Sequence, residues 1–305
     1  MRDSFISSLL EQAKKDPNIF LITGDLGFGV LEKFQETLPN QFINSGVNEQ
    51  SMMGLAAGLA STGKKVFVYS IGNFPTLRCL EQIRNDICYM NNPVAIVAVG
   101  GGYSYGNQGY THHALEDVAV MRAMPNMEVI IPSDETETYA ITKLIVDLNR
   151  PSYLRLSKKV NNDFSENKIE IDFGKIREIK HGQDGTILFT GSLADLCLGA
   201  AIELETDGLK VSVASMPFVS SIDLHYLKNA GNKGPLIHVE EHSYRGGSGS
   251  ALLEKINENN ININVKLIAA NQENLSNIGT QDYLRKLNGI SESEIISKFK
   301  SLKEV

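Results

Sequence analysis

The amino-acid sequence predicts an α/β protein of two domains, each with a mostly parallel β-sheet flanked by helices. Two observations predict this class: short apolar runs alternate with helical runs along the chain, and one long polar stretch interrupts the alternation. The alternation implies parallel strands, because a crossover helix returns the chain to begin the next strand in the same direction. A length of 305 residues is enough for two domains of ordinary size.

The elements of the first domain follow from this alternation. Short apolar runs bounded by polar residues are typical of buried strands, and the segments between them have helical spacing. We expect strands at 18–23, 65–71, 93–99, 127–133 and 152–156, and helices at 3–15, 48–62, 76–91, 114–123 and 134–149.

The polar, loop-rich run 160–184 marks the expected domain boundary. We therefore predict a first domain over 1–170 and a second, smaller domain over 180–305. Strand–helix alternation resumes in the second domain. Its strands are expected at 185–191, 210–216, 235–241 and 265–270, and its helices begin near 193, 222 and 248.

Composition excludes several classes of function. The net charge is −7 without a long basic run, which argues against nucleic acid or an anionic membrane as the main partner. The three cysteines contain no Cys-x-x-Cys pair, so we expect a reducing cytoplasm rather than a disulfide framework or a zinc site. No apolar run reaches 18 residues, so we predict neither a membrane span nor a signal peptide.

The stretch GGGYSYGNQGYTHH, residues 100–113, follows a predicted strand but does not fit a nucleotide-binding loop. In a Gly-x-Gly-x-x-Gly pattern its third position is Tyr105, and the next helix is expected only near Ala114, too far to hold a pyrophosphate. No Walker Gly-Lys-Ser/Thr follows, and adjacent His112 and His113 cannot share a ligand face on a helix. The chain also lacks a Gly-x-Ser-x-Gly elbow for a hydrolase.

Glu49 is the acidic residue with the clearest catalytic potential. It lies where a predicted strand gives way to a helix rich in Gly, Ala and Met, whose small side chains allow close packing. Burial favours the protonated form of a carboxylate, and such a group can share or donate a proton. The alternative is a first-turn glutamate that only stabilises its helix dipole. Composition leaves both interpretations open.

Three separated segments resemble the transketolase family of thiamine diphosphate enzymes. GVNEQSMMGLAAGLASTGKKVFV and THHALEDVAVMRAMPNMEVIIPSDETE are similar to the family's pyrimidine-binding domain. VEEHSYRGGSGSALLE is similar to its C-terminal domain. The resemblance extends over nearly the whole chain, and its closest form is the C-terminal subunit of a split transketolase.

This resemblance implies a cofactor site around Glu49. In the family, a glutamate at this position hydrogen-bonds N1′ of the aminopyrimidine and favours the imino tautomer, which takes the proton from thiazolium C2. The resemblance also implies that Phe74 stacks on the pyrimidine and that Ile71 takes the place of a second aromatic residue. Asp25 and Leu26 match a pair that lies against the cofactor.

The resemblance implies a substrate site as well. His112 matches the histidine of a Gly-x-Thr-His segment that reaches the cofactor and the oxygen atoms of the donor, and it is predicted to be catalytic with Glu49. Arg2 and Lys158 match two cationic positions that hold a sugar phosphate in the family. For both residues, a solvated surface charge is an equally open interpretation. The predicted substrate-binding residues are Arg2, Gly100, Tyr105, Gln108, His112 and Lys158.

One expected motif is missing. Thiamine diphosphate enzymes hold the diphosphate and Mg²⁺ with Gly-Asp-Gly followed by an Asn, and this chain has no Gly-Asp-Gly. We therefore expect an N-terminal partner subunit with that motif to hold thiamine diphosphate and Mg²⁺, in a heterotetramer. This chain alone would then bind no metal.

Departures from the family pattern concern the substrate. The family usually has a His at the position of Gly100, an acidic pair at Asn107-Gln108, and a Ser at Gly29. The tyrosines of the loop, Tyr103, Tyr105 and Tyr110, offer flat faces with polar tips instead. We expect an acceptor other than a simple pentose phosphate, such as a modified or nucleotide-linked sugar.

The resemblance leaves several functions open. The leading interpretation is a transketolase subunit that moves a ketol unit between sugar-type substrates. The alternatives are the β subunit of a 2-oxo-acid dehydrogenase, a split synthase of the deoxyxylulose-phosphate type, and a non-catalytic scaffolding subunit that kept the fold.

Overall fold

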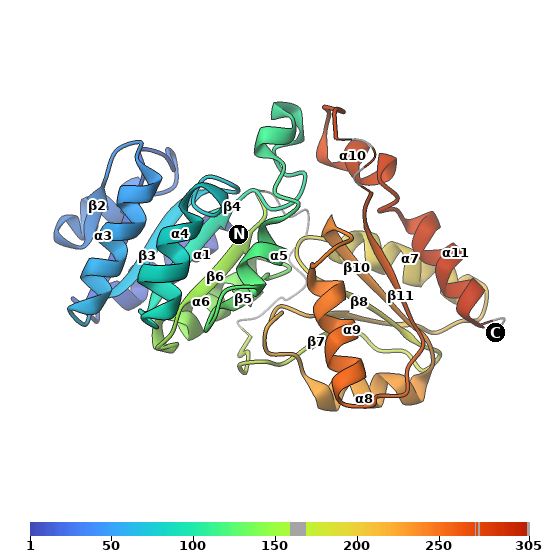
Figure 1. Cartoon of the computed structure of the whole chain (residues 1–305). Helices are drawn as coiled ribbons and strands as arrows, with labels where there is room; N and C mark the ends of the chain where they lie inside the picture. Colours follow the sequence, from blue (N-terminus) through green and yellow to red (C-terminus); the bar gives the residue numbers. More distant parts are fainter. Residues whose placement is uncertain (159–168, 272, 274, 304–305) are drawn as a thin grey trace.

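The structure, a computed structural model, describes residues 1–158, 169–271, 273 and 275–303. It contains two β-sheets, each flanked by helices, and the predicted two-domain α/β class is confirmed. Figure 1 shows the two sheets side by side, the first in blue to green and the second in yellow to red.

The first sheet has six strands, all paired in parallel in the order β2-β1-β3-β4-β6-β5. Strand β4 (VAIVAV) is buried at every position, as expected for a parallel strand covered on both faces. The strands are β1 (Ile19–Thr23), β2 (Phe42–Asn44), β3 (Lys65–Ile71), β4 (Val94–Val99), β5 (Glu128–Ile130) and β6 (Ser152–Leu156).

Alternating side chains of these strands enter two different hydrophobic layers. On one face, Phe67, Tyr69 and Val97 pack with α1 (Arg2–Ala13) and α6 (Glu135–Asp147). Val66, Val68 and Ile96 enter the layer on the other face. That layer is formed by α3 (Glu49–Ser61), α4 (Leu80–Gln82) with the π-helical η3 (Ile83–Tyr89), and α5 (Asp117–Arg122).

The second sheet has the order β11-β10-β8-β9-β7, and only β7 runs antiparallel to its neighbour. One face is covered by α7 and α11, and the other packs with α8 and α9. The strands are β7 (Arg177–Lys180), β8 (Thr186–Phe189), β9 (Ser212–Ser215), β10 (Leu236–Ser243) and β11 (Val265–Ala270). The helices are α7 (Ala194–Thr206), α8 (Leu224–Lys233), α9 (Ser248–Glu258), α10 (Gln281–Leu287) and α11 (Glu292–Lys303).

The second domain also covers the exposed edge of the first sheet. Backbone bonds join Ile131 to Pro217 and Val219 to Val129, so the segment after β9 pairs with edge strand β5. An unpaired strand edge is open to unwanted association, and this pairing closes it. The two sheets are therefore joined by main-chain bonds as well as by side chains.

Most predicted elements have close counterparts, with three differences. The helix expected at 114–123 spans only Asp117–Arg122, because Ala114 forms a backbone bridge with Gly102. The helix expected at 76–91 is split into η2 (Leu77–Cys79), α4 and η3. The run 160–184 contains strand β7, although we predicted it as loop-rich; its residues 160–168 lie outside the described part.

Short elements without a strong pattern complete the first domain. They are α2 (Glu32–Thr37) and η1 (Pro39–Gln41), which lead into β2, and the two turns η4 (Gly106–Gln108) and η5 (Tyr110–His112). No helix among the described residues is long and apolar enough to cross a membrane.

Candidate active site

Most of the candidate residues lie at one edge of the first sheet. In open α/β sheets, ligands bind at the carboxyl ends of the strands, where the chain leaves the sheet. Asp25 and Leu26 follow β1, Glu49 follows β2, Ile71 ends β3, Gly100 follows β4, and Lys158 follows β6.

Glu49 is the first residue of α3, and Asn48 caps that helix by accepting a hydrogen bond from the Ser51 amide. The side chain of Glu49 is buried, at 5% exposure. Its Oε2 lies 2.8 Å from Nη1 of Arg78. Among the described residues, none donates a hydrogen bond to Oε1 of Glu49. One carboxylate oxygen is therefore bound by a cation, and the other is free to accept from a ligand.

Phe74 lies beside this ion pair, in the turn after β3. The Arg78 guanidinium is 5.4 Å from the centre of the Phe74 ring, which is within the range of a cation–π contact. Cys79 donates a weak hydrogen bond to the Phe74 carbonyl at 3.7 Å. Burial, together with the nearby charge of Glu49, raises the pKa of the Cys79 thiol to about 12, so this thiol stays protonated at neutral pH.

His112 connects Phe74 to the glycine-tyrosine loop, which comprises residues 100–114. Its ring meets Phe74 edge-on at 5.3 Å and Tyr105 at 6.3 Å between ring centres. Lys158 Nζ lies 4.9 Å from the centre of the Tyr105 ring. The order of contacts is thus Glu49–Arg78, Phe74, His112, Tyr105 and Lys158.

Tyr105 occupies the space next to Gly100. Gly100 has φ +96°, and a Cβ atom there would lie 2.2 Å from Cε2 of Tyr105. Any larger residue at position 100 would have to displace the Tyr105 ring. Burial raises the pKa of Tyr105, so its hydroxyl is neutral at physiological pH.

Asp25 occupies a backbone conformation that is uncommon for a residue with a side chain, at φ +58°. Its backbone N–H donates to Asn44 Oδ1 and its Oδ1 accepts from Asn44 Nδ2, both at 3.0 Å. The Thr23 hydroxyl donates to the Leu26 carbonyl at 3.0 Å. These bonds fix the turn after β1 against the end of β2.

The remaining candidates have weaker connections to this group. Arg2 begins α1, and its positive charge acts on Tyr105 and Tyr69. Ile71 is half-buried at the end of β3, and Gln108 is exposed on η4. The structure therefore brings Glu49, Phe74, His112, Tyr105 and Lys158 into one chain of contacts, and leaves Gln108 at its margin.

The three loop tyrosines lie in different surroundings, and buried Tyr103 does not offer the flat face that we expected. Tyr103 is 3% exposed and packs edge-on against His113 in the core of the second domain, with ring centres 5.3 Å apart. Tyr110 is exposed, and its hydroxyl donates to Glu116. Only Tyr105 is placed beside His112, because alternate loop residues turn toward different neighbours.

Sequence reasoning missed three polar residues of the site. They are Arg78 beside Glu49, Asn44 beside Asp25, and Asn73, whose Nδ2 donates to the His113 carbonyl at 2.8 Å. Each contact joins segments 19 to 40 residues apart, so no local spacing indicates it. The sequence indicates these site residues only through their positions near the ends of predicted strands.

Among the described residues, no group of three or more His, Cys, Asp or Glu side chains could hold a metal ion. A cleft of about 600 Å³ is lined by Asn107 and Lys158 together with Gln281 and Arg285, whereas Glu49, Phe74 and His112 do not line it. Its size is within the usual range for a small-molecule site of about 300–1,000 Å³.

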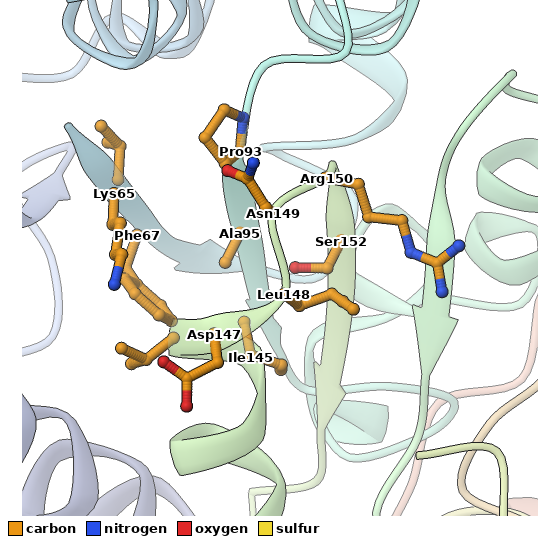
Figure 2. A pocket seen from close by; sticks show the side chains of 12 residues that line it. Lys65, Phe67, Pro93, Ala95, Ile145, Asp147, Leu148, Asn149, Arg150 and Ser152 are labelled. Carbon is orange, nitrogen blue, oxygen red and sulfur yellow. The ribbon is translucent and has the colours of Figure 1, made fainter. Parts of the chain in front are cut away.

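Figure 2 shows a smaller cavity at the opposite edge of the first sheet. Lys65, Pro93 and Ser152 lie there at or just before the amino ends of β3, β4 and β6. Its volume of about 140 Å³ is small for a coenzyme, and none of the candidate residues lines it.

Two family models match this chain. Residues 1–162 match the transketolase pyrimidine binding domain, and residues 174–295 match the transketolase C-terminal domain. Together the two models cover most of the sequence.

Individual relatives are similar over nearly their full length. An apulose-4-phosphate transketolase subunit of Phocaeicola vulgatus is 37% identical, over 90% of this chain and 88% of that protein. A 6-deoxy-6-sulfo-D-fructose transketolase subunit of a Clostridium species is 31% identical, over 97% and 92%. A solved split-gene transketolase, described as an inactive β4 tetramer, has a TM-score of 0.91 and 31% identity over 99% of this chain and 97% of that one.

A second group of relatives is matched only in part. The 1-deoxy-D-xylulose-5-phosphate synthase of Syntrophus aciditrophicus is 31% identical over 98% of this chain, but over only 46% of its own length. The similarity therefore covers about half of that longer protein.

Proposed function

This chain belongs to the transketolase family as a subunit of the split, heteromeric type, and we propose that its half of the active site holds the pyrimidine end of thiamine diphosphate. The observation that carries the proposal is the buried carboxylate of Glu49. It lies at the carboxyl edge of the sheet, with one oxygen paired to Arg78 and the other free. The same Arg78 covers the ring of Phe74, and His112 meets that ring edge-on.

Each residue of this chain has a separate task in the proposal. When bound, thiamine diphosphate supplies the carbon nucleophile that accepts and releases a ketol unit. Glu49 holds a proton at a ring nitrogen of the cofactor through its free Oε1. Phe74 and Ile71 provide an apolar surface for the pyrimidine ring. Asp25 and Leu26, in the turn after β1, form a wall of the pocket.

The diphosphate and Mg²⁺ half of the site belongs to a second polypeptide in this proposal. The chain has no Gly-Asp-Gly, and its described residues offer no cluster of metal ligands. Large apolar side chains are exposed on the segments that carry the site: Phe28 is 78%, Val47 75% and Leu77 42% exposed. Such residues together mark a surface that a partner covers. The expected partner is an N-terminal subunit with Gly-Asp-Gly and a following Asn, and the expected assembly is a heterotetramer.

We propose a sugar-type acceptor that carries an anionic group. Lys158 and Arg2 supply positive charge next to Tyr105, and the ring of Tyr105 offers a flat face to a sugar. The names of two relatives specify a sugar phosphate and a sulfo-sugar, which both carry an anion. Gly100 and Gln108 replace residues that bind a simple pentose phosphate in the family, so we expect the acceptor to be a modified or nucleotide-linked sugar.

Two further proposals concern the chain as a whole. We place its domains at 1–170 and 180–305, because the first range contains the whole first sheet and the second contains the second sheet apart from most of its edge strand β7. We also propose a cytoplasmic location. The three cysteines are free and form no disulfide, which suits a reducing compartment.

The test of this function is Glu49→Gln in the complex with its Gly-Asp-Gly partner. We expect ketol transfer to fall by at least about 10²–10⁴-fold, because a proton-transfer partner of the cofactor is lost. The matched control is Glu135→Gln, which removes an exposed first-turn glutamate from α6. Near-normal activity of Glu49→Gln would overturn the assignment and favour a helix-dipole role for Glu49.

The similarity to 1-deoxy-D-xylulose-5-phosphate synthases supports a second candidate function. The same complex should then form 1-deoxy-D-xylulose 5-phosphate. Measuring that product beside ketol transfer separates the two activities.

A further inference from the structure

The glycine-tyrosine loop, residues 100–114, has a narrow neck. Gly102 and Ala114 pair through two backbone hydrogen bonds of 2.9 and 3.0 Å, so the loop leaves the sheet and returns at the same point. His112 and Tyr105 lie within the loop. Whatever holds the neck therefore determines where both side chains stand.

The second domain holds one side of the neck through Glu241, a residue of β10 that is 6% exposed. Its Oε1 accepts the Tyr103 backbone N–H at 2.6 Å. Its Oε2 accepts from Nε of Arg285 at 2.6 Å, and Gln281 Nε2 donates to both oxygens at 3.0 and 3.1 Å. Each carboxylate oxygen is thus occupied by donors, and one donor is the main chain of the loop.

The first domain holds the other side through Arg155 of β6. Arg155 Nη2 donates to the Ala114 carbonyl at 2.6 Å and to the main-chain carbonyl of Glu241 at 3.0 Å. Its Nε donates to buried Asp117 at 2.7 Å. Buried polar groups with every partner in place define one arrangement, because each alternative leaves a charge unpaired.

Glycine is required where these side chains approach the loop. A Cβ at Gly101 would lie 2.7 Å from Nε of Arg155, and a Cβ at Gly102 would lie 2.6 Å from the carboxyl carbon of Glu241. Gly102 also has φ +64°. The two charged side chains therefore pack directly on the loop backbone.

The far end of the loop is held to the same domain. The Gly279 amide donates to the Gly106 carbonyl at 3.3 Å, and His113 Nε2 lies 3.2 Å from that carbonyl. Residue 279 precedes α10, which carries Gln281 and Arg285, the partners of Glu241. Figure 1 shows α10 beside the green loop segment at the top of the molecule.

We propose that Glu241 is a positioning residue for the reaction, through which the second domain holds the loop that carries Tyr105 and His112. The carboxylate does not touch the reacting groups; it holds the Tyr103 amide and so fixes the loop. This inference deepens the proposed function and rests on it for its kinetic outcome. It assigns the second domain a role in substrate placement.

The first test is Glu241→Gln in the full chain and in the complex. An amide has one acceptor oxygen, so Gln cannot satisfy the Tyr103 N–H, Arg285 and Gln281 together. We expect faster hydrogen exchange across residues 103–113. We also expect kcat/KM for the acceptor to fall by up to about 100-fold, mainly through KM, because small displacements of positioned groups are costly.

The matched control is Glu137→Gln. Glu137 is also a buried carboxylate that joins the two domains, since it accepts from Ser215 and lies 3.7 Å from Arg177, but it does not contact the loop. Glu137→Gln should lower the midpoint of thermal unfolding at least as much as Glu241→Gln, and leave loop exchange and acceptor KM unchanged. Equal loop exchange in the two variants would overturn the inference.

A second pair of variants leaves the charged side chains of Glu241, Arg285 and Arg155 in place. Gly102→Ala forces a Cβ against Glu241, whereas Gly208→Ala has similar backbone strain, at φ +83°, with nothing within 4 Å. Only Gly102→Ala should loosen the loop and raise the acceptor KM. A loosened loop with normal kinetics would contradict the positioning role. Full activity of His112→Ala would instead contradict the proposed function and leave the exchange results intact.

Discussion

Glu49 and Arg78 form an ion pair with 2.8 Å between Oε2 and Nη1, although the two residues are 29 positions apart in the chain. The glutamate is buried, and the arginine side chain is 54% exposed. The same guanidinium covers the ring of Phe74 at 5.4 Å. Arg78 therefore orients both the acidic group and the aromatic group that the proposed cofactor site needs.

Removing Arg78 should weaken cofactor activation without abolishing it. Because the Arg78 half of the pair is 54% exposed, we take about 1 kcal/mol, the upper end for exposed ion pairs, and expect Arg78→Gln to raise the thiamine diphosphate concentration at half-maximal activity by about fivefold. The control is Arg84→Gln, because Arg84 is exposed and bonds only to its neighbour Asn85 among the described side chains. Identical cofactor titrations for the two variants would show that Arg78 does not orient Glu49.

Gly100 and Tyr105 should behave as a coupled pair. Gly100→Ala places a Cβ 2.2 Å from the Tyr105 ring, and overpacking of this kind costs about 1–3 kcal/mol. Tyr105→Ala should relieve the steric part of this cost in the double variant, although the strain of φ +96° remains. Urea unfolding of the two single variants and the double variant measures the coupling. Additive losses in stability would mean that the two positions do not compete for space.

The same pair should control the choice of acceptor. Tyr105→Ala removes the aromatic face between His112 and Lys158 and opens the space above Gly100. We expect KM for the natural acceptor to rise, and KM for ribose 5-phosphate to change less, because a simple pentose phosphate depends less on the ring. Efficient ribose 5-phosphate turnover by the wild-type complex would contradict a modified-sugar acceptor.

His238 should make the second domain sensitive to acid. Burial lowers the pKa of its imidazole below the ordinary value of 6.5, and its Nε2 lies 2.8 Å from the Ser248 hydroxyl. The unfolded chain then binds more protons than the folded chain between the folded pKa and pH 6.5. The free energy of unfolding should therefore fall as the pH drops below 6.5, by at most about 1.4 kcal/mol per pH unit from this group.

Urea unfolding between pH 5 and 7.5 measures this dependence. His238→Gln should flatten the curve below pH 6.5, while His225→Gln, on the exposed side of α8, should leave it unchanged. Parallel curves for wild type and His238→Gln would assign the acid sensitivity to other groups.

The sequence predicted the buried part of the fold well, because buried parallel strands are continuous apolar runs. Strand β4 is buried at every residue, and its pattern predicted it within one residue. Strand β7 was missed because this half-buried edge strand, Arg-Glu-Ile-Lys, pairs on one side only and has no apolar run. Strand β2 was expected only as the strand that precedes Glu49, without bounds, because three residues are too few to form a pattern.

The candidate site was predictable through residues that resemble a family motif, such as Glu49, Phe74 and His112, which the structure brings together. Contacts between distant segments were not predictable. Nothing near Arg78 in the chain indicates that it reaches Glu49, and nothing near Tyr103 indicates that it turns into the core of the second domain. Glu241 is similar, because its partner Tyr103 lies 138 residues away and in the other domain.

Titration calorimetry with thiamine diphosphate and Mg²⁺ tests most directly the claim that this chain holds half of an active site. We predict weak binding to the isolated chain, and tight, Mg²⁺-dependent binding to the complex with the Gly-Asp-Gly partner. Tight, Mg²⁺-dependent binding to the isolated chain would contradict a site divided between two subunits.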